Sequence, residues 1–311
     1  MSRKVEIFPY RATDAATWDR IVEESDAACL LFLRRYMDYH ANRFADASLV
    51  GVADGSPIGV YPASIKDHVV TSHAGLTFGS WQLGPGLSEQ DRRRLAELTF
   101  DYYASNGVKK LVARETPQHF NSSETWSHAS YRPPTSSTKL DGSAIDLSST
   151  LSLGPKRRPS RCLKALQTHE FSSSCPEEFW PLLERVLLVR HGISPTHSLR
   201  EIQQLYSRLP SQIQVFKAAS LNDLAAGAVI FLSRNVAHIQ YMATSEAGRV
   251  SHALDGLIVW LIRRFAGQVR WLSLGVSNER DGTINQGLHD YKMSFGAKHF
   301  VHETNTYDLS R

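Results

Sequence analysis

The hydrophobic pattern of the second half of the chain predicts strands that alternate with a helix. Residues 212–234 alternate apolar and polar positions on both sides of a polar turn at Asn222 and Asp223, as two hairpin-connected strands do. The pattern then predicts, in order, a strand over 235–244, a loop over 245–253, a helix over 254–267 and a strand over 269–277.

The first half of the chain repeats this order. Residues 48–67 read as two strands joined at Asp54 and Gly55, a dipeptide that accepts the positive φ of a hairpin turn. A β-rich stretch follows over 68–83, then a helix that Ser88 caps and Asn106-Gly107 ends, then a strand over 108–113. The two series match at an offset of about 160 residues, which indicates one α/β unit used twice.

The segments around the two series set the expected domain boundary. Residues 131–162 are rich in Ser and Pro; within them 137–147 alternates like a closing strand, and 148–155 reads as the boundary. We therefore expect two domains, residues 1–150 and 151–311. Helices are expected ahead of each series, over 16–25, 32–44, 176–191 and 198–209.

Composition narrows the class of protein. The chain has 311 residues, 42% of them hydrophobic, and its 35 Lys and Arg exceed its 31 Asp and Glu by 4. This charge is too small for the dense positive field of a dedicated DNA-binding protein. Three widely spaced cysteines fit neither a disulfide framework nor a zinc cluster, and no stretch approaches the ~18 apolar residues of a membrane span. We expect a cytoplasmic protein without a membrane-spanning segment.

Several ordered segments resemble a known family. They are SLVGVADGSPIGVYPA, SHAGLTFGSWQL, RHGISPTHSLREI, AHIQYMATSEAG and LHDYKMSFGAKHFVHE. Together they resemble the FemAB-like branch of the GNAT acyltransferase superfamily. The resemblance implies a mixed α/β fold of two tandem GNAT-like domains packed side by side. It also implies acyl transfer, with either an acyl-CoA or an aminoacyl-tRNA as the donor.

The donor loop departs from the pattern of the superfamily. A standard GNAT loop has the form Q/R-x-x-G-x-G/A and leads into a helix whose N–H groups hold a pyrophosphate. Here the matching segment, 245–253, has the single glycine Gly248, and the resemblance assigns donor binding to Gly248, Arg249 and Ser251. The first half offers Gly84-Pro85-Gly86, whose proline lacks an N–H. A simple chain turn at Gly248 is the alternative.

The strand over 235–244 carries the main catalytic candidates. Strict alternation places His238 and Gln240 on one face and Tyr241 on the other. Polar side chains on a central strand are costly unless paired, which makes His238 a catalytic candidate and Gln240 a substrate contact. Tyr241 could protonate a leaving group. Ordinary core packing is the alternative for each.

Further candidates follow the strands of both halves. Ser277, Asn278 and Glu279 come after the last strand of the series, where open sheets bind ligands, and Glu279 is a possible base. Lys292 lies in a segment that resembles a family pattern and could hold a phosphate or carboxylate. The other expected substrate contacts are His73 and Thr77 in the glycine-rich stretch 72–79, and His191 and His197 beside a turn.

The histidines and a basic segment bear on whether the chain binds a metal or a phosphate. The histidines lack zinc-motif spacing, so no metal site is expected. Basic residues cluster at Lys156–Arg158, with Arg161 and Lys164 beyond, and belong either to a solvated surface or to a phosphate contact with tRNA.

Three hypotheses of function result. The first is transfer of an acyl group, acetyl above all, from acyl-CoA to an amine of a small molecule such as a nucleotide-linked amino sugar. The second is an aminoacyl-tRNA-dependent transferase. The third is a non-catalytic pair of GNAT-like domains that acts as a binding module.

Overall fold

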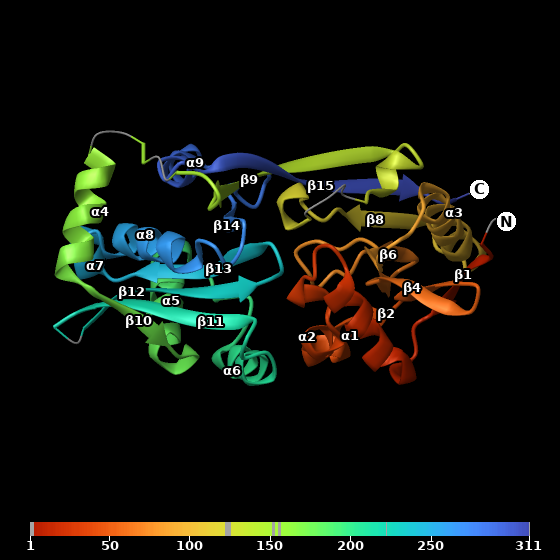
Figure 1. Cartoon of the computed structure of the whole chain (residues 1–311), viewed down its shortest axis with the longest axis horizontal. Helices are drawn as coiled ribbons and strands as arrows, with labels where there is room; N and C mark the ends of the chain where they lie inside the picture. Colours follow the sequence, from red (N-terminus) through yellow and green to blue (C-terminus); the bar gives the residue numbers. More distant parts are fainter. Residues whose placement is uncertain (1–2, 122–125, 151–152, 155–156, 222, 311) are drawn as a thin grey trace. The chain divides into compact units, whose positions relative to one another are not determined.

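The chain folds into two compact units (Figure 1). A computed structural model describes residues 3–121, 126–150, 153–154, 157–221 and 223–310. Unit 1 runs to Leu140 and also includes the residues from Val301 onward, while unit 2 comprises Asp141–Phe300. The division differs from the expected one at residue 150, because the boundary falls within the strand over Ser136–Asp146 and the end of the chain returns to unit 1. Within the described residues, no helix is long and apolar enough to cross a membrane.

Unit 1 has two sets of paired strands. One set has the order β1-β3-β4-β7, and in the other β8 lies between β15 and β6, with β5 and β2 beyond. The hydrophobic core packs α3 against β1, β3 and β4. The elements are β1 (Val5–Pro9), α1 (Ala15–Glu24), α2 (Arg34–Met37), β2 (Ala45–Asp46), β3 (Leu49–Ala53), β4 (Ser56–Tyr61), β5 (Ser64–Lys66), β6 (Val69–Thr71), β7 (Gln82–Leu83), α3 (Glu89–Ser105), β8 (Lys110–Arg114) and the end of β15 (Lys298–Asp308).

Unit 2 has a sheet of order β10-β11-β12-β13-β14-β9. Its neighbours are antiparallel except for the parallel pair β13 and β14. The hydrophobic core of unit 2 lies between α8 and one face of this sheet. The elements are the end of β9 (Ser136–Asp146), α4 (Arg157–Thr168), β10 (Glu170–Ser174), α5 (Pro176–His191), α6 (Leu199–Arg208), β11 (Ile213–Ser220), β12 (Asp223–Leu232), β13 (Val236–Thr244), α7 (Glu246–Val250), α8 (Ala253–Phe265), β14 (Trp271–Val276), α9 (Gln286–Met293) and the start of β15.

Local chemistry explains where these elements begin and end. Ser88 caps α3 in a capping box with Asp91, and Gly107 follows its end with a φ of 75°. Ser198 and Glu201 form the same box at α6. The turn between β3 and β4 has positive φ at both Asp54 and Gly55, as a two-residue hairpin requires.

Three expected elements differ from the structure. The helix expected over 32–44 is broken: α2 has four residues, and His40 then takes a non-helical φ of −125°. The loop expected over 245–253 contains α7. Of the β-rich stretch 68–83, only β6 and β7 are strands. The turn residue Asn222 lies outside the described residues.

Candidate functional site

A pocket of about 510 Å³ opens at the carboxyl end of β13 in unit 2. β13 and β14 pair in parallel over only three residue pairs, from Val236–Trp271 to His238–Ser273, and β13 then continues beyond this pairing. The pocket contacts the end of β13 and the elements around it. Its basic lining residues are Arg158, Arg161, Arg190, Arg249, His191 and His252. A concave site with this many guanidinium groups is suited to a phosphate or carboxylate.

Arg158 is the most firmly held of these arginines. Its guanidinium forms an ion pair with Asp255 at 2.6 Å and lies 4.8 Å from the ring centres of both Tyr291 and Phe295. The Tyr291 hydroxyl donates to the same carboxylate at 2.9 Å. Burial raises the pKa of Tyr291 well above its usual value, so the phenol remains a donor. Arg158 therefore has a fixed orientation, whereas Arg161 and Arg190 are exposed.

The loop before α8 does not offer its glycine N–H to a ligand. Ser245 Oγ accepts the Gly248 N–H at 3.0 Å. A Cβ at Gly248 would lie 2.0 Å from the Ala225 carbonyl oxygen, so this glycine lets α7 approach β12 closely. Gly248 and Arg249 do line the pocket. The Ser251 hydroxyl lies 3.0 Å from His169 Nε2.

A β-bulge in β13 overturns the expected alternation. Val229 opposes Tyr241, while the next residue, Ile230, opposes Ile239, which leaves Gln240 as the extra residue. Met242 consequently packs with Ile239 in the core under α8. Tyr241 instead contacts Trp180 of α5, with 5.2 Å between ring centres. The prediction that His238 and Gln240 are alternate residues of a regular strand is therefore wrong, because Gln240 is the extra residue of the bulge.

Two histidine–hydroxyl contacts involve side chains of β13, His238 before the bulge and Tyr241 after it. His238 Nδ1 lies 3.0 Å from Ser273 Oγ, on the partner residue in β14. His197 Nδ1 lies 2.6 Å from the Tyr241 hydroxyl. Burial raises the pKa of Tyr241, so its hydroxyl keeps its proton at neutral pH. Each contact fixes the direction of an imidazole ring.

Lys292 belongs to α9, and its side chain reaches the carboxyl end of β14. It is 3% exposed, and its ammonium donates to the carbonyl oxygens of Gly275 at 3.2 Å and Val276 at 2.6 Å. Burial lowers its pKa to about 8. The neighbouring Ser277 hydroxyl is buried and has no hydrogen-bond partner among the described residues. The lysine expected from the family pattern is therefore a buried cation beside a polar strand end.

Asn278 and Glu279, the next residues after β14, form hydrogen bonds that stabilise the loop to which they belong. Asn278 Oδ1 accepts the Asp141 N–H at 2.6 Å, and its amide donates to the Gly282 carbonyl at 2.9 Å. Glu279 is exposed and accepts from the Asn285 amide at 2.6 Å. The geometry gives Asn278 a structural role in the loop and leaves the Glu279 carboxylate at its surface.

In unit 1 the equivalent place is filled by the chain itself. β6 and β8 also pair in parallel over three residue pairs. The segment 72–79 then packs along β8: Arg114 donates to the carbonyls of Ala74 and Leu76, and the Arg114 carbonyl accepts the Gly79 N–H. His73 is buried beside His40, and Thr77 is exposed. The glycines of this stretch permit close packing against His40 and the Ser72 carbonyl.

Some site residues were not among the candidates from the sequence. Arg158 and Arg161 belonged to a basic run with two interpretations, and their spacing of three on a helix was the available signal. Asp255, Tyr291 and Ser273 gave no local signal, because their partners are distant in the chain. Among the described residues, no three His, Cys, Asp or Glu side chains are placed to hold a metal ion.

Comparisons with solved structures identify the fold. No protein-family model and no curated protein sequence matches the chain. FemX superposes with a TM-score of 0.67 at 10% identity, over 97% of both chains. The C-terminal domain of a protein named as a lysylphosphatidylglycerol synthetase from Agrobacterium fabrum gives 0.62 at 13%, over 96% of this chain and 92% of that chain.

A tandem GNAT protein of the clavulanic acid biosynthesis pathway gives a TM-score of 0.50 at 13% identity, over 99% of both chains. At such low identities the likeness concerns the fold. Together with the mixed sheets and the repeated order of elements, it shows that this chain has the FemX-like, tandem GNAT fold.

Proposed function

We propose that this protein is an amide-forming acyltransferase whose acyl donor binds, through phosphate, at the arginine-lined pocket of unit 2. The pocket is the observation that carries the proposal, because four arginines line it at the carboxyl end of β13. Phosphate is the common feature of acyl-CoA and aminoacyl-tRNA, and arginine forks suit it. The tandem GNAT fold supports acyl transfer as the reaction.

The loop chemistry favours aminoacyl-tRNA over acyl-CoA as the donor. The Gly248 N–H is satisfied by Ser245, so anion binding at this loop depends on side chains more than on main-chain N–H groups. Exposed arginines such as Arg161 and Arg190 suit the spaced phosphates of an RNA end. Acyl-CoA, the first expectation from the sequence, remains the second candidate because one arginine, Arg158, is fixed as a single phosphate site would require.

The acceptor is an amine, and residues on the α5 side of β13 and at the end of β14 supply the chemistry. His238, oriented by Ser273, takes the proton from the attacking amine. Tyr241, held by His197, donates to the leaving oxygen or sulfur. Lys292 provides positive charge for the oxyanion that develops at the carbonyl. A small molecule such as a nucleotide-linked amino sugar is the proposed acceptor class.

The test combines ligand-induced thermal stabilisation with amide formation. We expect an aminoacylated RNA hairpin to raise the melting temperature, with an affinity that falls steeply as salt rises. The double variant Arg161→Ala/Arg190→Ala should weaken this binding at least about tenfold. Lys164→Ala serves as the matched control. Lys164 is an exposed, positively charged residue on α4, the helix that carries Arg161, but it does not line the pocket.

The outcomes separate the hypotheses. Stabilisation by acetyl-CoA and not by the hairpin would select the second donor. If neither donor binds and no amide forms with amine acceptors, the transferase proposal fails and the binding-module hypothesis gains support. His238→Ala tests the same point in cells: full function with intact folding would exclude His238 catalysis.

A further inference from the structure

Within the described residues, the first strand of unit 1 is paired along one edge only, and its other edge is open. β1 is the terminal strand of its sheet and pairs with β3. The Asp54 N–H bonds to the Lys4 carbonyl, and the Tyr10 N–H bonds to the Ser48 carbonyl, so the even-numbered residues of β1 point their main-chain groups at β3. Val5 and Ile7 therefore point theirs at the open edge. Pro9, which has no N–H, ends that edge.

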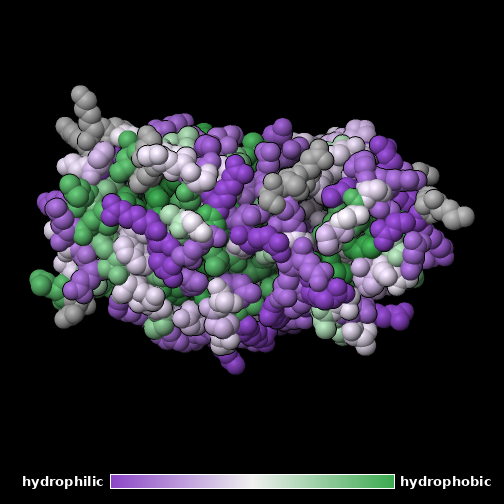
Figure 2. Space-filling view, viewed as in Figure 1, coloured by the Kyte–Doolittle hydropathy of each residue, from purple (hydrophilic) through white to green (hydrophobic). Residues whose placement is uncertain are grey.

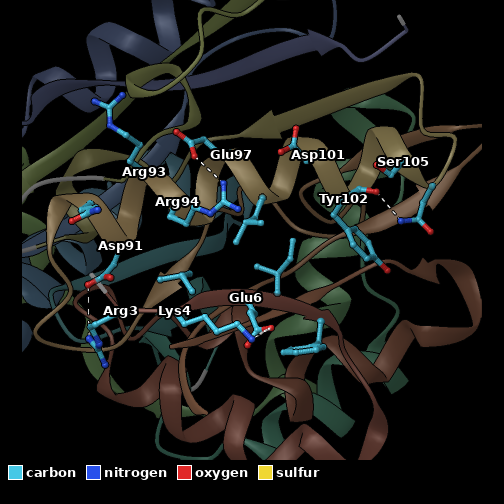
Figure 3. Close-up of a pocket in the computed structure, with 16 residues that line it drawn as sticks. Arg3, Lys4, Glu6, Asp91, Arg93, Arg94, Glu97, Asp101, Tyr102 and Ser105 are labelled. Carbon is cyan, nitrogen blue, oxygen red and sulfur yellow. Dashed lines mark hydrogen bonds and ion pairs between the residues drawn. The ribbon is translucent and has the colours of Figure 1, made fainter. Parts of the chain in front are cut away.

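A groove of about 830 Å³ runs along this open edge and the flank of α3. Its walls are β1 on one side and the stretch from Gln90 to Asn106 on the other (Figure 3). The surface over α3 is predominantly polar (Figure 2), and the charged residues near the groove form local ion pairs. An extended main chain is the group that such an edge recognises, since it matches unpaired N–H and C=O groups.

The side chains of β1 are complementary to a second copy of themselves. In an antiparallel pair of two β1 strands centred on Val5, each Lys4 lies opposite the Glu6 of the other copy. A pair centred on Glu6 would oppose two carboxylates, and one centred on Ile7 would place Pro9 in the ladder. The Val5 register alone combines opposite charges with main-chain groups able to bond.

The flank of α3 fits the same two-fold arrangement. Val5 and Ile7 pack toward the core beneath α3, so Lys4 and Glu6 lie on the other face of the strand, where Lys4 is 77% and Glu6 42% exposed in their side chains. In a symmetric pair, the two α3 helices would run antiparallel on one face of the joined sheet. Arg94 and Glu97, each 49% exposed, then offer opposite charges to each other across the axis.

We propose that two copies of this chain associate through their β1 strands, in antiparallel register centred on Val5. The contact is isologous and joins the two sheets into one. The shared edge is short, so we expect a weak dimer with a dissociation constant of about 10–100 µM. The groove along α3 receives the partner strand.

Sedimentation equilibrium of the full chain over a range of concentrations tests the proposal. Lys4→Glu and Glu6→Lys should each weaken association at least about tenfold, because each places like charges opposite one another. The double variant Lys4→Glu/Glu6→Lys should restore it, and an equimolar mixture of the two single variants should form heterodimers. Ile7→Pro should abolish dimers while leaving the β3 ladder intact, since the Ile7 N–H points away from β3.

Circular dichroism of each variant verifies folding before association is interpreted. A chain that stays monomeric at all concentrations would overturn the proposal. So would a dimer that is indifferent to the two charge reversals, because another surface would then carry it. Since association does not involve the pocket of unit 2, its failure would leave the proposed transferase activity untouched.

Discussion

At the scale of single residues, Lys292 combines burial with an unusual set of partners. Its ammonium donates to two main-chain carbonyls, whose partial negative charge is weaker than that of a carboxylate. Desolvation lowers its pKa to about 8, close enough to neutral that the charge can be titrated without unfolding the chain. A positive charge that is not cancelled by an acid remains available to a developing oxyanion.

Lys292→Arg should change the pH dependence of turnover. In the natural chain, activity that needs the charged amine is present below pH 8 and falls as the pH rises through about 8. An arginine stays charged, so the basic limb of the variant should move up by at least one pH unit. Rate constants measured between pH 6 and 10 provide the test. Activity that instead rises through pH 8 would show that the neutral amine acts, as a base.

Lys292→Met provides the companion measurement, because it removes the charge at every pH. We expect turnover to fall by about 100-fold with donor affinity little changed, as for the loss of one oxyanion donor. Equal losses in donor affinity and turnover would place Lys292 in ground-state binding.

Ser273→Ala should lower turnover without a large loss of stability. The Ser273 hydroxyl fixes the His238 ring, and its removal lets the imidazole rotate away from the acceptor. A decrease in kcat of about tenfold, with KM for the donor unchanged, is the expected result. Thr168→Ala is the control: it removes a hydroxyl that also lies near a histidine nitrogen, at 3.1 Å from His169 Nδ1, but on α4. An equal effect of both variants would contradict a specific role for Ser273.

At the scale of elements, the sequence predicts what local chemistry determines. The hairpin at Asp54-Gly55 and the capped helix after Ser88 occur as expected. A strand also forms close to residues 137–147, but it does not simply close the first unit, because its end pairs with β14 in unit 2. The bulge at Gln240 could not be expected, because a bulge depends on the register that β12 imposes from elsewhere in the chain. This one extra residue decides which face of β13 carries Tyr241.

The candidate site shows the same limit. His238, Tyr241 and Lys292 stand out in the sequence by residue type and by family pattern, as does His197, the partner of Tyr241, but Ser273, the partner of His238, does not. Ser273 is 35 residues from His238, and Asp255 is 36 from Tyr291. Such pairs arise from the parallel crossover and from helix packing, which a single sequence does not specify residue by residue.

Gly248→Ala tests whether that glycine serves packing or ligand binding. The added Cβ would meet the Ala225 carbonyl at 2.0 Å, so α7 must move away from β12. We expect a loss of about 2 kcal/mol or more in the free energy of unfolding, measured by urea denaturation. Gly287→Ala in α9 is the control, because its Cβ has room and the helix should gain slightly. Unchanged stability with lost donor binding would instead assign Gly248 to the ligand.

At the scale of the whole molecule, two strands run from one unit into the other. β9 and β15 each contribute residues to both units, and unit 1 consists of two separate stretches of chain, whereas unit 2 is the continuous stretch Asp141–Phe300. Unit 1 buries the paired rings of His40 and His73, whose centres lie 5.3 Å apart. Desolvation lowers the pKa of both to about 4, and the neighbouring Arg43 and Arg34 act in the same direction on His40 and His73 respectively.

These two histidines should make the chain sensitive to mild acid. Their pKa values are lower in the folded state than the usual 6.5, so they favour the folded state fully above pH 6.5 and progressively less as the pH falls toward 4. Each proton taken up on unfolding contributes a slope of about 1.4 kcal/mol per pH unit. Urea denaturation followed by tryptophan fluorescence between pH 4 and 7 measures that slope. His40→Leu should reduce it by close to one proton, because the leucine fills the buried space without titrating. A slope that stays the same in this variant would mean that other groups control the acid sensitivity of the protein.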